Sequence, residues 1–143
     1  ALVISNVAAL VEDRPLAEIR PEDSVRDACK TMCDLDVRAA VVLDNRRLVG
    51  VLSEQDVVRK CICADRHTAE TKVSEIMTAE VKTITRDRTV TECMTTITEE
   101  HIRHLPVVES DELVGLISVG DVVKAVIAEQ AFLIEQLEQY ITS

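Results

Sequence analysis

A serine and an aspartate three residues apart occur twice in the chain, each pair shortly after a glycine in an apolar run. The pairs are Ser53 with Asp56 and Ser118 with Asp121. A strand that runs into a helix leaves unpaired amides and the positive end of a helix dipole, which favour phosphate. A neighbouring carboxylate can accept hydrogen bonds from two vicinal ribose hydroxyls. A nucleoside monophosphate requires this combination.

The same spacing also describes a capping box, in which the serine caps a helix and the acid returns to the serine amide. Ser24 with Asp27 and Thr89 with Glu92 have this spacing without any need for a ligand. Spacing alone leaves both interpretations open and favours capping.

Basic residues recur at a matching place. Arg38 and Arg103 each precede a Ser-x-x-Asp pair by 15 residues, and His104 follows Arg103. A guanidinium fork matches phosphate oxygens, and an imidazole could add a donor. The alternatives are an arginine that is simply exposed to solvent and a histidine bonded to backbone at a strand edge.

These matches belong to an internal repeat. Residues 22–59 align with residues 87–124 without a gap at an offset of 65, and 11 of the 38 pairs are identical. A long period with a matched register indicates a duplicated folding unit, so a site that is built once is expected twice.

Each copy has the pattern of strand, helix, strand, strand and helix. Apolar runs predict the strands, and capping residues predict helices that open at Ser24, Ser53, Thr89 and Ser118. The predicted strands are 16–19, 39–43, 48–52, 81–84, 105–108 and 113–117. A short helix over residues 7–11 and a polar connector over 62–75 complete the prediction. The fold class is therefore α/β (α+β), with two β-α-β-β-α repeats.

The tail is longer than one repeat needs. Apolar residues keep helical spacing from Val122 to Ile141, about five turns. The surplus half, residues 132–141, either covers the module or contacts a second copy. We favour a homodimer contact, because an apolar helix end needs a partner surface.

Composition excludes several classes of protein. A net charge of −10 argues against a nucleic-acid partner. No run of 18 apolar residues predicts a membrane span, and no leader pattern opens the chain. The five cysteines have no zinc-site spacing, so we expect no metal ligand set, and unpaired thiols favour a cytoplasmic location. Cys29 and Cys93 lie on apolar helix stripes and are predicted to be small core residues.

The pattern resembles a tandem pair of CBS domains, the module named after cystathionine β-synthase, of the stand-alone bacterial or organellar type. The resemblance covers about residues 11–128, with repeats at 11–63 and 76–128 and a helical tail at 129–143. Its most specific pieces are residues 50–56, 103–108 and 115–121, and residues 73–78 look like the segment that opens a second repeat.

The resemblance implies repeats related by pseudo-twofold symmetry, with two clefts that bind AMP, ADP, ATP or NAD(H), and sometimes S-adenosylmethionine. Asp56 and Asp121 would hold ribose, with Ser53 and Ser118 near phosphate. Arg103 and His104 would face the phosphate in the Asp121 cleft. The base would lie against apolar residues of the opposite repeat: Ile19, Val37 and Ala40 for the Asp121 cleft, and Ile84 and Ile102 for the Asp56 cleft.

The two clefts need not be equal. Ala39 stands where the second copy has His104, and Glu54 adds a negative charge where the second copy has Val119. We therefore expect tighter phosphate binding at Asp121, although Arg59 or Lys60 could compensate at the other cleft.

The predicted function is a regulatory sensor of adenine nucleotides that has no catalysis of its own and acts on a separate protein partner. The chain contains no phosphate-cradling Gly-rich loop and no hydrolase motif. Two alternatives stay open. One is an assembly module with empty clefts, and the other is a small thiol enzyme that uses Cys93 with His101, Arg103 and His104.

Overall fold

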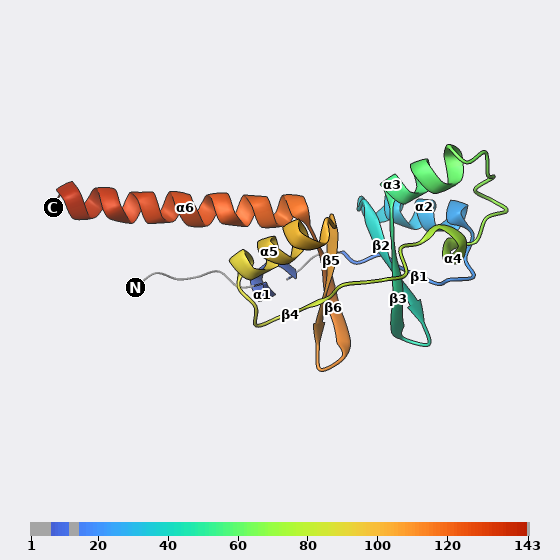
Figure 1. The fold of residues 1–143 in the computed structure, drawn as a ribbon, viewed down its shortest axis with the longest axis horizontal. Helices are drawn as coiled ribbons and strands as arrows, with labels where there is room; N and C mark the ends of the chain where they lie inside the picture. Colours follow the sequence, from blue (N-terminus) through green and yellow to red (C-terminus); the bar gives the residue numbers. More distant parts are fainter. Residues whose placement is uncertain (1–6, 12–14, 143) are drawn as a thin grey trace. The chain divides into compact units, whose positions relative to one another are not determined.

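The structure is a computed structural model, and it describes residues 7–11 and 15–142. The chain divides into two compact units. The Asp56 unit is Asp13–Lys82, and the Asp121 unit is Thr83–Ser143 together with Ala1–Glu12. The fold of each unit is shown in Figure 1.

The Asp56 unit is built on a three-stranded sheet in the order β1-β2-β3. The strand β1 pairs parallel with β2, and β2 pairs antiparallel with β3. In chain order its elements are β1 (Glu18–Ile19), α2 (Val25–Leu35), β2 (Ala39–Asp44), β3 (Arg47–Ser53), α3 (Glu54–Asp56), the π-helical turn η1 (Val57–Ile62) and α4 (Val73–Ile76).

The Asp121 unit has the same sheet in the order β4-β5-β6. Its elements are α1 (Ala8–Val11), β4 (Ile84–Thr85), α5 (Val90–Glu100), β5 (His104–Glu109), β6 (Glu112–Ser118) and α6 (Val119–Thr142). The predicted α+β class and the strand–helix–strand–strand–helix order are confirmed.

The offset of 65 extends into backbone detail. The bounds of α2, β2 and β3 fall 65 residues before those of α5, β5 and β6. The residues that end α2 and α5, Asp36 and His101, both have left-handed backbone. The two-residue hairpin turns, Asn45-Arg46 and Ser110-Asp111, have positive φ at both positions. This is the conformation that matches the twist of paired strands.

The opening helices α1 and α4 also lie 65 residues apart, yet each joins the unit of the other copy. The helix α1 contacts β6, and Val7 N donates to Arg88 O at 2.9 Å. The helix α4 contacts β3, and the segment after it pairs with β3 through Val51 and Thr78. Each copy therefore supplies its opening helix to the sheet of the other copy.

Each unit has its own apolar core. In the Asp56 unit, the apolar face of α2 is buried at Val25, Ala28 and Met32, and Leu52 from the sheet is fully buried with them. Cys29, which was predicted to be a core residue, packs against this core but is only partly buried. In the Asp121 unit, Val90, Cys93 and Ile97 of α5 are buried beside the sheet residues Leu105 and Ile117. Cys93 is thus a core residue, as its position on the helix stripe predicted.

The helix that opens after Ser53 differs from the simple α-helix that we expected. Three α-helical residues are followed by η1, in which Cys63 N donates to Val58 O five residues back, at 2.8 Å. This wider turn buries Val57 and Cys61 and leaves Arg59 and Lys60 exposed. The chain then turns into the connector, whereas the equivalent helix of the second copy continues.

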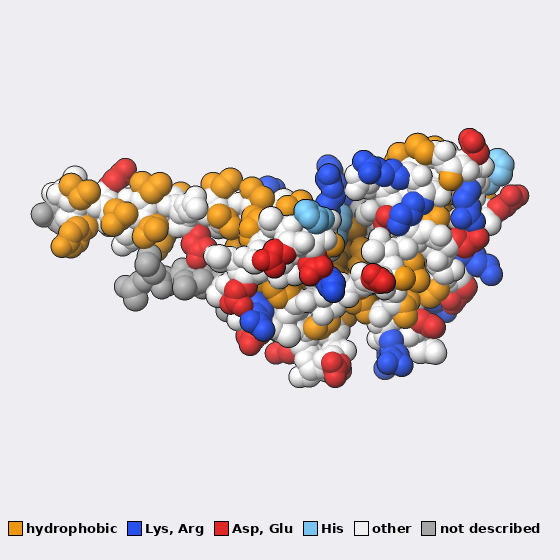
Figure 2. Space-filling model, in the orientation of Figure 1, with side chains coloured by type: hydrophobic (Ala, Val, Ile, Leu, Met, Phe, Trp, Pro, Cys, Tyr) orange, Lys and Arg blue, Asp and Glu red, His pale blue; other side chains and the backbone are white. Residues whose placement is uncertain are grey.

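That second helix is α6, a continuous helix of 24 residues. The predicted long C-terminal helix is confirmed. Its outer half carries large exposed apolar side chains, among them Leu137 at 53% and Tyr140 at 82% exposure. Figure 2 shows hydrophobic side chains along the length of this helix.

Candidate functional site

Ser53 and Asp56 form a reciprocal pair at the junction of β3 and α3. Ser53 N donates to Asp56 Oδ2 at 3.0 Å, and Asp56 N donates to Ser53 Oγ at 3.1 Å. The capping interpretation of this spacing is therefore correct. The cap uses only Oδ2 of the carboxylate, and it fixes the orientation of the Asp56 side chain.

Ser118 and Asp121 repeat this geometry at the junction of β6 and α6. Ser118 N donates to Asp121 Oδ2 at 2.9 Å, and Asp121 N donates to Ser118 Oγ at 3.2 Å. Both acids are only partly buried. Each unit therefore holds one partly buried carboxylate in a fixed orientation.

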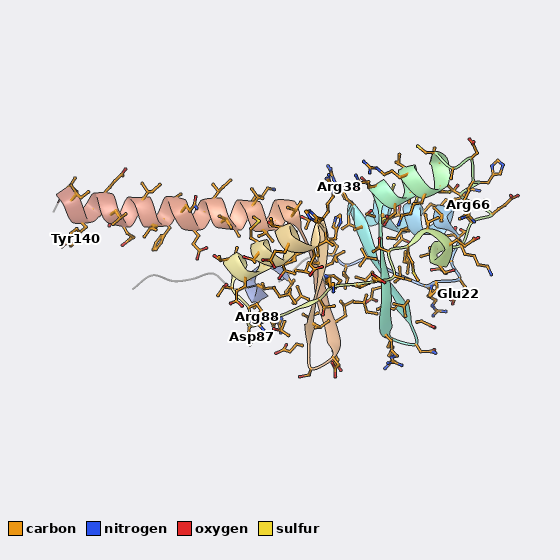
Figure 3. The ribbon with its side chains drawn as sticks, viewed as in Figure 1. Glu22, Arg38, Arg66, Asp87, Arg88 and Tyr140 are labelled. Atoms are coloured by element: carbon orange, nitrogen blue, oxygen red, sulfur yellow. The ribbon has the colours of Figure 1, made fainter. Side chains whose placement is uncertain are left out.

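The two arginines lie beside these boxes. Strand register pairs Ala39 with Ser53 and His104 with Ser118, so the residue just before each middle strand is next to the start of the following helix. The carbonyl of Arg38 accepts from Glu54 N at 3.0 Å, and that of Arg103 accepts from Val119 N at 2.8 Å. Both side chains are exposed, and Figure 3 shows Arg38 at the start of β2.

The structure thus brings the predicted polar residues together within each unit. Arg38, Ser53 and Asp56 form one cluster. His104 is half-buried at the first position of β5, and it joins Arg103, Ser118 and Asp121 in the other cluster.

Fewer helix amides are available than the sequence led us to expect. The first amide of α3 donates to Arg38 O, and the third donates to Ser53 Oγ. The first and third amides of α6 are used in the same way, by Arg103 O and Ser118 Oγ. A phosphate at either place would therefore depend mainly on side-chain cations.

One cation of the Asp56 unit is already paired with the site carboxylate. Lys60 Nζ lies 3.1 Å from Asp56 Oδ1, and the side chains are 47% and 14% exposed. The residue 65 positions later is Ala125, which carries no charge. Sequence reasoning noted Lys60 as a compensating charge but missed this pairing, although the i,i+4 spacing after an acid is its ordinary signal.

The apolar residues that we expected to contact the base in one cleft belong to a different unit from the aspartate of that cleft. Ile19 and Ala40 are 4% and 0% exposed in the Asp56 unit, and Ile84 is 7% exposed in the Asp121 unit. Val37 and Ile102 are half-buried against these cores. Contact of these five residues with a ligand stays a prediction, and Val37 and Ile102 expose the most surface for it.

Burial acts against an activated thiol at Cys93 and at Cys29. Cys93 is fully buried, and this desolvation raises the pKa of its thiol from 9.0 to about 11. Desolvation, followed by the nearby Cys33, Cys61 and Glu54, also raises the pKa of Cys29. A thiolate nucleophile needs the opposite shift.

Two further features are absent from the part of the chain that the structure describes. Within residues 7–11 and 15–142, no group of three or more His, Cys, Asp and Glu side chains could hold a metal ion. No helix among the described residues is both long and apolar enough to span a membrane.

Comparison with known proteins decides the family. The family model described as "CBS domain" matches twice, at residues 7–62 and 73–128. The chain belongs to the CBS-domain family. The two matched stretches start with α1 and α4, the helices that are exchanged between the units.

Individual relatives agree with this assignment. A mitochondrial CBS domain-containing protein of Arabidopsis thaliana, CBSX3, is 38% identical over 125 residues, which are 84% of this chain and 61% of that protein. The CBS chain therefore spans about three fifths of the length of this plant relative.

Solved structures show the same fold. A structure from Burkholderia ambifaria, described as that of a signal-transduction protein with CBS domains, has a TM-score of 0.81 and 37% identity over 88% of this chain and 96% of that one. The CBS domain pair of protein MJ0100, in complex with 5′-methylthioadenosine and S-adenosyl-L-methionine, has a TM-score of 0.78 over 89% of this chain and 99% of that one. Its identity is 21%, so this likeness concerns the fold alone.

Proposed function

We propose that this CBS pair is a non-catalytic regulatory module that binds an adenosine-containing ligand such as AMP, ADP, ATP or NAD(H). Asp56 and Asp121 would accept hydrogen bonds from ribose hydroxyls. Arg38, Arg103 and His104 would face phosphate, with Ser53 and Ser118 nearby. The apolar residues Ile19, Val37, Ala40, Ile84 and Ile102 would contact the base.

One observation carries this proposal. Both copies hold an aspartate in a reciprocal bond to a serine beside an exposed arginine, and the arrangement is reproduced in two units that differ in most other residues. A cap alone does not require the arginine. A solved CBS pair of the same fold was determined with two adenosine-type ligands, which supports the ligand class.

Calorimetry with a panel of AMP, ADP, ATP, NADH and adenosine tests the proposal directly. We expect binding of at least one phosphorylated ligand at micromolar to millimolar concentration. A ligand that binds only the folded state raises the melting temperature by mass action. Absence of binding by every member of the panel at millimolar concentration would leave the assembly module as the better description.

A second feature supports self-association as part of this function. We propose that the outer half of α6 forms a homodimer contact. At 100° per residue, its exposed apolar residues Leu133, Ile134, Leu137, Tyr140 and Ile141 fall on one side of the helix, whereas Phe132 lies outside that side. Glu135 and Glu138 lie on the remaining surface, so the apolar side is the part that most needs cover. A CBS-CP12 protein of similar fold is described as hexameric.

We also propose that the protein works in a reducing compartment such as the cytoplasm. All five cysteines are free thiols, and Cys33 and Cys63 are exposed. Exposed thiols persist where the thiol pool is reduced. The regulated partner protein would be found in the same compartment.

A further inference from the structure

We propose that Lys60 makes the Asp56 site selective for phosphorylated adenosine ligands over adenosine itself. This inference rests on the proposed function, and it assigns a specificity-determining role to one residue. In the unliganded protein Lys60 neutralises the ribose-binding carboxylate. A ligand that brings its own phosphate draws Lys60 away and frees the carboxylate for ribose.

Asp56 is already bonded at both carboxylate oxygens in the unliganded protein. Its Oδ2 accepts from Ser53 N, and its Oδ1 is paired with Lys60 Nζ at 3.1 Å. Both carboxylate oxygens are therefore engaged before any ligand arrives. A ribose diol can bind only in competition with the ammonium group.

The Lys60 side chain can readily leave its ion pair with Asp56. Its side chain is 47% exposed, and an exposed i,i+4 ion pair contributes only about 0.3–0.5 kcal/mol. The four-carbon stem lets the ammonium move several ångströms without disturbing η1. The pair is thus strong enough to compete with a neutral ribose and weak enough to yield to a phosphate.

Few positive groups near Asp56 are available to bind that phosphate. The first and third amides of α3 are bonded to Arg38 O and Ser53 Oγ, and Glu54 adds a negative charge at the same helix start. Arg38 is one cation at this end of the sheet, and Lys60 is a second within reach of the site acid. A phosphate would therefore gain much of its stabilisation from Lys60.

The second copy has Ala125 at the position equivalent to Lys60, and Val119 replaces Glu54. The selectivity that we assign to Lys60 therefore concerns the Asp56 site.

The test is calorimetry of AMP and adenosine with the full chain in an Asp121→Ala background, which leaves only the Asp56 site. Circular dichroism checks that the background is folded, and Asp121→Asn serves where the alanine variant melts too low. In this background Lys60→Met should tighten adenosine binding about twofold, because the competing pair is lost. It should weaken AMP binding about tenfold, because a charged donor is lost. The AMP-to-adenosine preference then falls about twentyfold.

Arg59→Met is the matched control, because Arg59 is the neighbouring exposed cation and no ion pair with Asp56 involves it. It should leave adenosine binding unchanged and weaken AMP binding by less than threefold. Equal effects of the two variants on AMP, with adenosine unchanged in both, would overturn the assignment of Lys60. AMP binding that is present in the unmodified protein and absent from the Asp121→Ala background would also overturn it, and the proposed function would survive. If neither AMP nor adenosine bound the unmodified protein, the proposed function would fail, and the role of Lys60 would fail with it.

Discussion

Val11 lies so close to Gly115 that a Cβ on the glycine would fall 2.7 Å from Val11 Cγ1 and 2.8 Å from Val11 Cβ. The first copy repeats this relationship, because a Cβ on Gly50 would fall 2.6 Å from Met77 Sδ and 3.0 Å from Thr78 O. Gly50 and Gly115, which precede the two Ser-x-x-Asp pairs, therefore let the opening segment of the other copy pack closely against the strand. Their role is in packing, and the proposed ligand contacts come from the Ser-Asp pair that follows each glycine.

Gly115→Ala should destabilise the protein by about 1–3 kcal/mol, because the new methyl group must displace Val11. Gly120→Ala is the control, since the nearest atom to its added Cβ is Ser118 Oγ at 3.7 Å. We expect the control to melt at or slightly above the wild-type temperature. Chemical denaturation measures both variants, and equal stability of the two would contradict the packing role of Gly115.

Asp121→Ala should have two separable effects. The loss of its bond from Ser118 N should lower the stability of the unliganded protein by about 0.5–2 kcal/mol. The loss of the proposed ribose acceptor should remove the part of the ligand-induced rise in melting temperature that comes from the Asp121 site, which we expect to be the larger part. Thermal unfolding with and without saturating AMP measures both quantities in one experiment.

Thr89→Ala controls for the first effect, because Thr89 caps α5 in the same way and lies outside the candidate site. It should cost similar stability and leave the ligand-induced shift intact. A full shift in Asp121→Ala would show that Asp121 is only a cap.

The buried thiol of Cys93 predicts a defined pH dependence. Its folded pKa of about 11 lies above the unfolded value near 9.0, so the folded state keeps its proton where the unfolded state loses it. This contribution is fully present below pH 9 and is lost as the pH rises towards 11. It amounts to about 3 kcal/mol.

Cys93→Ala should therefore flatten the decline in unfolding free energy between pH 8 and pH 10.5, apart from a constant loss for the cavity. Alkylation gives a second measurement. At pH 8 the exposed Cys33 and Cys63 should react with iodoacetamide well before Cys93. Rapid labelling of Cys93 in the folded protein would contradict the burial and reopen the thiol-enzyme hypothesis.

Local patterns predicted the long helices and the paired strands well, because apolar periodicity and capping residues act over a few positions. The first strand of each copy is shorter than predicted: β1 is Glu18–Ile19 rather than 16–19, and β4 is Ile84–Thr85 rather than 81–84. The α2 face at Val25, Ala28 and Met32 and the cap at Ser24 follow directly from spacing. The exchange of α1 and α4 did not follow, since it depends on contacts between residues about 100 and 25 positions apart, such as Val11 with Gly115 and Met77 with Gly50.

The polar clusters were predictable for the same reason, but not all of the hydrogen bonds and ion pairs within them were predicted. Repeat register placed Arg38 with Ser53 and Asp56, and strand pairing confirms this grouping. The loss of free helix amides is a result of the three-dimensional structure, whereas the i,i+4 spacing of Asp56 and Lys60 was available in the sequence. The apolar contacts to a base involve residues of both units and stay predictions.

The exposed side of α6 predicts how the protein assembles. Leu137 is 53% exposed on the apolar side, whereas Gln139 lies about 200° further around the helix. Leu137→Glu places a charge in the proposed contact and should convert a dimer to a monomer in light scattering. Gln139→Glu adds the same charge on the opposite side and should leave the dimer intact. Because the outer half of α6 lies beyond the sheet contacts of its unit, neither variant should lower the melting temperature of the monomer. A monomer in the unmodified protein at tens of micromolar, or a dimer that survives Leu137→Glu, would exclude this helix as the self-association surface.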